Sequence, residues 1–183
     1  MEDRAREPAL EAGHPAMRTL VLVRHAKSSW KDAELADRDR PLNPRGRRDA
    51  PEMGRRLAVR GATPDRIVTS PALRAATTAS VIAEAVGYPE REIIQDERLY
   101  GAGSEEILEV IRGIENRFDR VLLFGHNPGL TDLVNKLSEE PIPNVPTCGV
   151  VEFRIAGESW RDVRRDTAMR VDFDYPKRSR GVL

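Results

Sequence analysis

Residues 18–28 read RTLVLVRHAKS, an apolar run that stops at an arginine followed by a histidine. Leu20 to Val23 have the composition of a strand that is buried on both faces, as in a parallel sheet. Such a strand can end in almost any polar residue, so Arg24 and His25 alone do not establish a functional site. The rest of the chain decides whether the pair belongs to one.

Strand and helix patterns alternate along the rest of the chain. Further strands are expected at residues 66–69, 91–95, 120–124, 150–155 and 169–173. Apolar residues at helical spacing predict helices after the second, third and fourth strands and one before the second. This alternation predicts an α/β fold, a single domain whose mostly parallel sheet is flanked by helices on both faces.

Capping residues predict where the helices begin and end. Asn43-Pro44 and Ser70-Pro71 each combine an N-cap residue with a proline suited to the first helical turn. Ser104 is the expected cap of the next helix, and Gly87 is expected to end the one before it. Pro51 falls inside the first helical pattern and is expected to kink that helix or to move its start.

Composition restricts the classes of function. Among the 183 residues, 30 basic and 30 acidic side chains balance, so no bulk charge favours nucleic acid or an anionic membrane as a partner. Cys148 is the single cysteine, which excludes an intrachain disulfide and a cysteine metal cluster. No apolar run approaches the ~20 residues that span a bilayer. We expect a cytoplasmic protein in a reducing compartment.

Residues 1–16, MEDRAREPALEAGHPA, are polar and show no periodicity. They lack the apolar core of a signal peptide, and we expect a disordered extension in front of a domain at 17–183. His14 lies in this extension and is expected to have no specific role. Met17 directly precedes the first strand and is a possible start of translation.

Four polar groups follow the predicted strands. Arg24 and His25 end the first strand, Arg74 lies in the first helical turn after the second, Glu97 follows the third, and His126 follows the fourth. In open α/β sheets, ligands bind at the carboxyl ends of the strands, so these groups are expected to converge. Arginine forks suit phosphate oxygens, and a histidine between arginines is kept neutral and can attack phosphorus. A carboxylate can then protonate the leaving group.

Several ordered blocks carry a resemblance. They are LVLVRHAKSSW, RPLNPRGRRDA, IVTSPALRAATTA, DERLYGA and VLLFGHNPGL, with PTCGVVEF and YPK near the end. In this order, between Met17 and Lys177, the chain resembles the histidine phosphatase superfamily, which includes the cofactor-dependent phosphoglycerate mutases. Within the superfamily it is most similar to the SixA-type phosphohistidine phosphatases. The resemblance implies a phosphoglycerate mutase-like fold and a reaction that needs no cofactor or metal.

The resemblance also implies roles for the four groups. His25 would be the nucleophile that becomes transiently phosphorylated, and Arg24 and Arg74 would hold the phosphoryl oxygens. His126, expected to be protonated, would donate to the same group. Glu97 matches the acid carboxylate of the mutases, although the resemblance leaves open whether a short SixA-type protein uses it.

Three neighbours of the nucleophile complete the expected site. Lys27 and Ser28 directly follow the RHA block and are candidates to line the phosphate pocket. Ala26 stands where the superfamily usually has glycine. Because alanine disfavours positive φ, the backbone at Ala26 is expected to lie in an ordinary region.

Each residue also has a structural interpretation. Arg74 can be a surface charge, and His126 can form hydrogen bonds with backbone groups of the turn in which it lies. Glu97 can pair with Arg98 or Arg91 at the surface. A zinc site built from both histidines and Glu97 is a further alternative, but the flanking arginines would repel a cation.

The sequence therefore predicts a phosphatase that acts through a phosphohistidine intermediate. Short segments between the blocks leave little material for a lid, so the substrate is expected to be phosphohistidine of a protein or a small phosphate ester. The alternative is a catalytically weak module that binds a phosphorylated ligand in the same pocket. Phosphoglycerate mutase activity is disfavoured because the long insertions of the mutases are absent.

Overall fold

A six-stranded sheet forms the centre of the computed structural model, which describes residues 17–61 and 63–178. The strands are β1 (Met17–Arg24), β2 (Arg66–Thr69), β3 (Ile94–Gln95), β4 (Arg120–Gly125), β5 (Val150–Ala156) and β6 (Ala168–Asp174). Their order is β3-β2-β4-β1-β5-β6, and the first four are parallel, while β5 is antiparallel to both of its neighbours. The extension expected at 1–16, with His14, lies outside the described residues.

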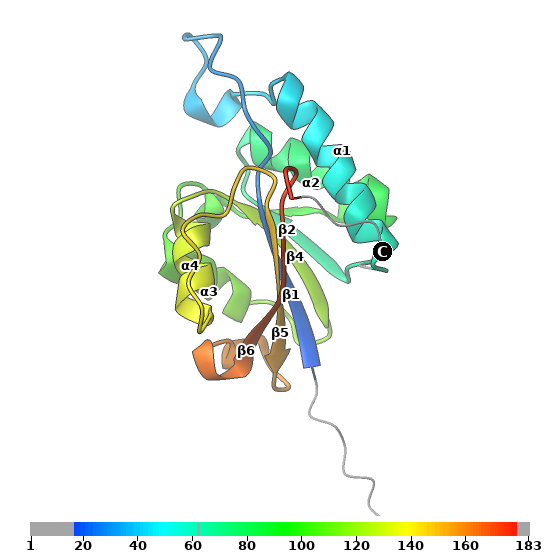
Figure 1. Ribbon diagram of the computed structural model, residues 1–183, viewed down its shortest axis with the longest axis vertical. Coiled ribbons are helices and arrows are strands. Elements are labelled where there is room, and N and C mark those ends of the chain that lie inside the picture. The colour runs from blue at the N-terminus through cyan, green and yellow to red at the C-terminus, as the bar shows by residue number, and fades with distance from the viewer. Residues whose placement is uncertain (1–16, 62, 179–183) are drawn as a thin grey trace, which may run out of the picture.

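Helices cover both faces of the sheet, as predicted. The helices are α1 (Pro44–Val59), α2 (Leu73–Val86), α3 (Ser104–Arg112) and α4 (Gly129–Leu137). In Figure 1, α1 and α2 lie on one side of the sheet and α3 and α4 on the other. Each pair of helices covers a separate buried hydrophobic cluster. One cluster lies around Met53 and Ile82, and the other around Leu108 and Leu133. The α/β fold class is confirmed.

Backbone hydrogen bonds align the carboxyl ends of the parallel strands. Arg24 of β1 lies opposite Gly125 of β4. The His25 N–H donates to the carbonyl of Gly125 at 3.1 Å, and the Ser70 N–H donates to the carbonyl of Phe124 at 3.0 Å. The residues that follow β1, β2 and β4 therefore meet at one edge of the sheet.

The start of α1 lies against the segment that follows β1. The Asn43 side chain accepts a hydrogen bond from the Gly46 N–H, and Pro44 is the first helical residue, as predicted. The helix continues through Pro51, which does not move its start. Gly46 permits a close approach, because a Cβ there would lie 2.2 Å from the Lys27 carbonyl oxygen.

The cap predicted for α2 is wrong. Ala72, not Ser70, is the N-cap residue, and the helix begins at Leu73. The Ser70 hydroxyl instead lies 2.7 Å from a ring nitrogen of His126. Gly87 ends the helix in the left-handed conformation with φ of 74°, as expected.

Two further boundaries differ from the prediction. The third strand was expected at 91–95, but Glu90–Glu92 form a 3-10 turn and only Ile94–Gln95 pair with β2. Pro89 precedes this turn, and β3 lies at the sheet edge, where it has a single neighbouring strand. Ser104 is the first residue of α3, and Gly103 is its N-cap.

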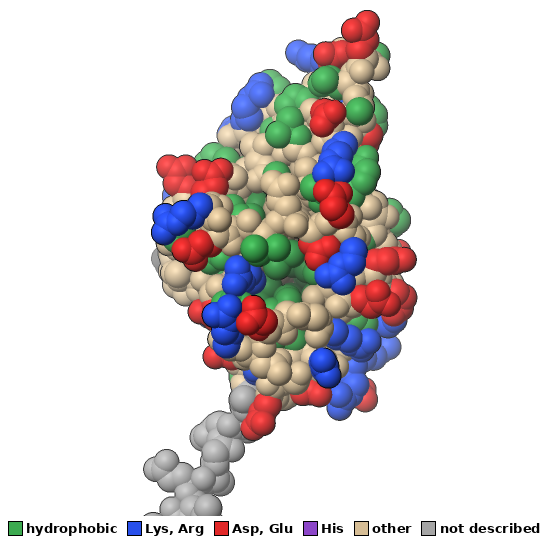
Figure 2. Space-filling model, turned by 180° about the vertical axis from the view of Figure 1, so that it is seen from behind, with side chains coloured by type: hydrophobic (Ala, Val, Ile, Leu, Met, Phe, Trp, Pro, Cys, Tyr) green, Lys and Arg blue, Asp and Glu red, His purple; other side chains and the backbone are tan. Residues whose placement is uncertain are grey.

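The surface shows no segregation of charge on the face in Figure 2, where basic and acidic side chains are interspersed. Of the helices in the described ranges, none is both long and apolar enough to cross a membrane.

Candidate active site

His25 lies at the end of β1 with one ring nitrogen engaged by the backbone. The side chain is buried, and Nδ1 lies 2.7 Å from the carbonyl oxygen of Ala26, to which Nδ1–H donates. This contact leaves Nε2 as the unprotonated nitrogen of a neutral ring. Burial, followed by the charges of His126, Arg74 and Arg24, lowers the pKa of His25 to about 3. A neutral His25 was expected, although burial contributes more to the shift than the arginines do.

Ala26 is held in an ordinary backbone conformation. Its N–H donates to the Thr78 hydroxyl at 3.0 Å, and Thr78 itself donates to the Arg74 carbonyl. Among the described non-glycine residues, only Cys148 has a positive φ, so the expectation for Ala26 is confirmed. Thr78 thus connects Ala26, the residue after His25, to α2.

Arg24 is oriented by a loop that precedes β5. Its Nη1 donates to the carbonyl of Val145 at 2.8 Å and lies 3.5 Å from the Asn144 side-chain oxygen. Burial lowers the pKa of Arg24. Its Nε is buried and has no hydrogen-bond partner in the part of the chain that is described.

Arg74 is held by Asp37, which lies in a 3-10 turn between β1 and α1 (Asp37–Asp39). Nη1 donates to the Asp37 carbonyl at 2.6 Å and Nη2 to its carboxylate at 2.9 Å. Tyr100 and Arg40 also donate to this carboxylate. Burial raises the pKa of Asp37, but hydrogen bonds from Tyr100 and Arg74 outweigh it and hold the pKa at about 2. Asp37 is therefore an ionised acceptor.

His126 faces His25 across the edge of the sheet, with ring centroids 5.1 Å apart. Burial, followed by the charge of Arg74, lowers the pKa of His126 to about 4. In the ligand-free protein His126 is therefore neutral, because a buried ring beside arginines loses its proton at neutral pH. Protonation of His126 with a phosphoryl group bound stays a prediction. Nε2 contacts Ser70, and the ring edge meets Tyr100 at a centroid distance of 6.0 Å.

Three nitrogens around His25 are buried and lack a hydrogen-bond partner: Nε of Arg24, Nε of Arg74 and Nδ1 of His126. Within the described ranges, six buried side-chain nitrogen or oxygen atoms share this property, so half of them belong to this site. Buried polar groups are normally paired, and an unpaired cluster requires an explanation. Acceptor oxygens of a ligand would satisfy the two arginine N–H groups, and Nδ1 of His126 as well when that nitrogen bears the ring proton.

Glu97 is not in contact with either histidine. It begins a 3-10 turn (Glu97–Leu99), its side chain is 71% exposed, and both of its oxygens accept from Arg38 at 2.9 and 2.7 Å. A surface ion pair was the predicted structural alternative, but with Arg98 or Arg91 as the partner. Arg98 pairs with Asp96 instead.

The two remaining candidates, Lys27 and Ser28, follow His25 closely in the chain and differ in burial. Ser28 is buried, and its hydroxyl accepts from Nη1 of Arg40 at 2.9 Å. Lys27 is exposed, and its carbonyl accepts from the Asn43 N–H at the start of α1. Neither contact brings the side chain of Lys27 or Ser28 to the three unpaired nitrogens.

Sequence reasoning missed Asp37, Tyr100, Ser70 and Thr78. Asp37 lies in ADRDRPL, which was interpreted only as a loop, although its alternating aspartates and arginines are a signal of a charge network. Tyr100 lies in the DERLYGA block already singled out for Glu97. Ser70 was assigned to a helix cap, which concealed its contact with His126.

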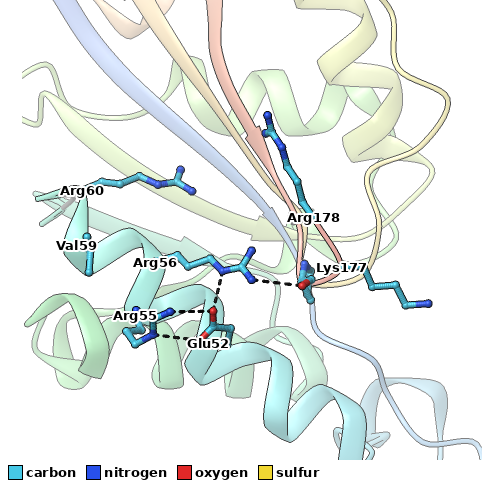
Figure 3. Close-up of a pocket in the computed structure, with 8 residues that line it drawn as sticks. Glu52, Arg55, Arg56, Val59, Arg60, Lys177 and Arg178 are labelled. Atoms are coloured by element: carbon cyan, nitrogen blue, oxygen red, sulfur yellow. Dashed lines mark hydrogen bonds and ion pairs between the residues drawn. The ribbon is translucent and has the colours of Figure 1, made fainter. Parts of the chain in front are cut away.

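A separate cavity of about 510 Å³ lies between α1 and the segment after β6. Arg55, Arg56, Lys177 and Arg178 line it, and Figure 3 shows Glu52 joined to both Arg55 and Arg56. It contains no histidine, and most of its cations are already paired with carboxylates. Chemistry is therefore assigned to the sheet edge and not to this cavity.

The zinc alternative lacks ligands. Within 17–61 and 63–178, no three His, Cys, Asp or Glu side chains are grouped so that they could hold a metal ion. Both histidines face arginines, and Glu97 is paired with Arg38.

Known proteins resemble the chain in sequence and in structure. Residues 20–100 match the family described as the histidine phosphatase superfamily (branch 1). The uncharacterized protein Rv1276c of Mycobacterium tuberculosis is 33% identical over 165 residues, which cover 85% of this chain and all of that protein. A 2,3-bisphosphoglycerate-dependent phosphoglycerate mutase of Chelativorans sp. is 40% identical over 89 residues, 45% of this chain and 43% of the mutase.

Among solved structures, the putative phosphohistidine phosphatase SixA from Nakamurella multipartita superposes with a TM-score of 0.76 at 26% identity, over 90% of this chain and all of that one. The putative phosphohistidine phosphatase SixA from Agrobacterium tumefaciens gives a TM-score of 0.73 at 26% identity, over 87% and 98% of the two chains. The sequence match includes His25, Arg24 and Arg74, and the structural likeness extends over the sheet that brings His126 to them. The chain belongs to the histidine phosphatase superfamily.

Proposed function

We propose that the protein is a phosphatase that forms a phosphohistidine intermediate on His25. The observation that carries the proposal is the group of three unpaired, buried nitrogens, Nε of Arg24, Nε of Arg74 and Nδ1 of His126, beside a neutral His25. A phosphoryl group offers oxygens to these donors, and preorganised donors aimed at developing charge each contribute a few kcal/mol to such reactions.

The proposed reaction has two steps. The lone pair of His25 Nε2 attacks phosphorus in line, the bond between phosphorus and the leaving atom breaks, and the leaving atom takes a proton from water. Water then attacks the phosphorylated His25, the P–N bond breaks, and neutral His25 and inorganic phosphate are released. Arg24, Arg74 and His126 hold the phosphoryl oxygens in both steps.

The positions of the acidic side chains favour substrates whose leaving group departs without a general acid. Asp37 is ionised, and Glu97 is exposed and paired with Arg38, so neither is placed as a proton donor. The imidazole of phosphohistidine leaves more readily than an alkoxide, which needs a general acid. The SixA structures that resemble this chain are described as putative phosphohistidine phosphatases, which supports the same substrate class. We therefore propose phosphohistidine of a protein, or a small phosphoramidate, ahead of alkyl phosphate esters.

The test is a trapping experiment with phosphoramidate, whose P–N bond resembles that of phosphohistidine. Wild type and His25→Ala are incubated and quenched at alkaline pH, and phosphate release and intact mass are measured. We expect release and a transient phosphoryl adduct on His25 in the wild type, and neither in the variant. Binding of inorganic phosphate without any release would instead identify a module that binds phosphorylated ligands.

A matched pair of arginine variants tests the donors. Arg24→Ala should lower kcat/KM for phosphoramidate by about 10²- to 10³-fold, because it removes one preorganised donor. Arg98→Ala removes an exposed arginine that pairs with Asp96 and should leave kcat/KM within about twofold. Equal effects of the two substitutions would contradict the proposed site.

A further inference from the structure

Ser70 is the first residue after β2, and no part of it is exposed to solvent. Its backbone N–H is used by the sheet, where it donates to Phe124. Its hydroxyl does not cap α2, which begins three residues later, but lies 2.7 Å from Nε2 of His126. The Ser70 hydroxyl is thus available for a hydrogen bond with the ring of His126.

The protons at this contact can be assigned by elimination. The Ser70 oxygen accepts a hydrogen bond from the Ala72 N–H at 3.3 Å. Its hydroxyl carries one proton, and His126 Nε2 is the acceptor that the described contacts offer it. If Nε2 carried the ring proton instead, a fully buried hydroxyl would be left with no acceptor, which costs about 1–3 kcal/mol. The favoured arrangement has Ser70 as the donor and Nε2 as the acceptor.

The same arrangement fixes the other nitrogen of the ring. Arg74, Arg24 and Arg40 surround His126 with positive charge, opposed by the Asp37 carboxylate, and the ring is neutral. A neutral imidazole that accepts at Nε2 carries its proton at Nδ1. Nδ1 of His126 is one of the three buried nitrogens at this site that have no partner among the described residues.

We infer that Ser70 is a positioning residue that keeps the proton of His126 on Nδ1, where it faces the phosphoryl group; its role in turnover rests on the proposed function. The two histidines of the site then occupy opposite tautomers. His25 donates from Nδ1 to the Ala26 carbonyl and keeps Nε2 bare for attack, whereas His126 accepts at Nε2 and keeps Nδ1–H for donation.

The tautomer of His126 can be measured directly. Ligand-free protein labelled with ¹⁵N is examined near pH 7 by two-bond ¹H–¹⁵N correlation, with His126→Gln used to assign the ring. We expect a protonated Nδ1 and an unprotonated Nε2 in the wild type. A ring protonated at Nε2, or at both nitrogens, would overturn the inference.

Ser70→Ala removes the hydroxyl, and we expect the proton of His126 to shift toward Nε2. We expect kcat for phosphoramidate to fall by about 10- to 100-fold, by analogy with the loss of hydrogen-bond partners that orient metal-ligating histidines. Ser138→Ala is the control, because Ser138 is also buried but its hydroxyl has no hydrogen-bond partner in the described residues. It should change neither the tautomer nor kcat.

The outcomes separate this inference from the proposed function. An unchanged His126 spectrum in Ser70→Ala overturns the inference even if the protein is an active phosphatase. A protein without phosphatase activity that shows the predicted tautomer, lost in Ser70→Ala, retains the inference and overturns the function. If Ser70→Ala does not fold, the wild-type spectrum still decides the tautomer, and Ser70→Thr, which keeps the hydroxyl, should retain it.

Discussion

Glu97 shows how a residue in a matching block can lack the contact its block implies. Its carboxylate is exposed and bound to Arg38, which lies next to the Asp37 that holds Arg74. The DERLYGA block alone therefore indicated the position of Glu97 but not its partner, because the partner comes from a loop about 60 residues away. The same limit explains why Ser70 was assigned to a helix cap.

Glu97→Gln should change kcat/KM for phosphoramidate by less than about threefold. A general acid contributes about 10²- to 10⁴-fold, and Glu97 is not placed to act as one. Steady-state rates with phosphoramidate and with phosphoserine as an alkyl phosphate measure the effect. A loss of 100-fold with either substrate would restore Glu97 as the acid, and Arg38→Ala serves as the control for loss of the surface ion pair.

The two histidines also make stability depend on pH. Their pKa values are lowered from 6.5 to about 3 for His25 and about 4 for His126, so between pH 6.5 and 4.5 the unfolded chain binds protons that the folded chain does not. The free energy of unfolding should therefore fall as pH falls through this window, by about 2 kcal/mol for each histidine. Urea unfolding at pH 6.5 and 4.5 measures it. The double variant His25→Gln/His126→Gln should lose most of this dependence, and an unchanged slope would contradict the burial of the two rings.

At the scale of elements, the hydrophobic pattern predicted the number, order and type of the major strands and helices, because burial on two faces leaves a periodic signal. Boundaries set by side-chain partners were less predictable. The starts of α2 and α3 and the two-residue β3 depend on contacts with other elements or on an edge position. The left-handed backbone of Cys148, whose N–H donates to the His25 carbonyl, had no local signal, since cysteine rarely adopts it.

Gly46→Ala tests the contact between α1 and the segment after the nucleophile. A Cβ at this position would overlap the Lys27 carbonyl oxygen, so the first turn of α1 or the Lys27 backbone must move. We expect a loss of about 1–3 kcal/mol in stability and a lower kcat, because Lys27 is two residues from His25. Gly113→Ala is the matched control, since its Cβ would lie 3.5 Å from the nearest atoms. Urea unfolding and phosphoramidate turnover would show no difference between the two if the close approach were unimportant.

At the scale of the whole molecule, a buried ion network joins the last strand to the first helix. Asp174 has no exposed surface and forms ion pairs with Arg56 of α1 and with Arg60, the C-cap residue of α1. Arg56 also donates to the Pro176 carbonyl. The sequence offered no means to predict this network, because its members lie more than 110 residues apart.

Asp174→Ala should lower the free energy of unfolding by about 3 kcal/mol, because it removes the buried anion shared by Arg56 and Arg60 and leaves each with one partly exposed carboxylate, Glu52 or Asp172. Glu115→Ala, which breaks an exposed pair with Arg117, should leave Tm unchanged. Thermal unfolding of the two variants compares them. Catalysis by Asp174→Ala below its Tm should persist, since the network lies apart from His25, and a selective loss of activity without loss of stability would contradict this assignment.

The unpaired nitrogens beside His25 lower the stability of the fold and at the same time provide the proposed phosphate site. Nε of Arg24, Nε of Arg74 and Nδ1 of His126 are buried without partners, so they cost the folded chain stability that a bound phosphoryl group would restore. Selection for stability alone would therefore not maintain these unpaired atoms. Only continued selection for turnover, or for capture of a phosphorylated ligand, can preserve them, so the persistence of these residues in a lineage is itself a record of use.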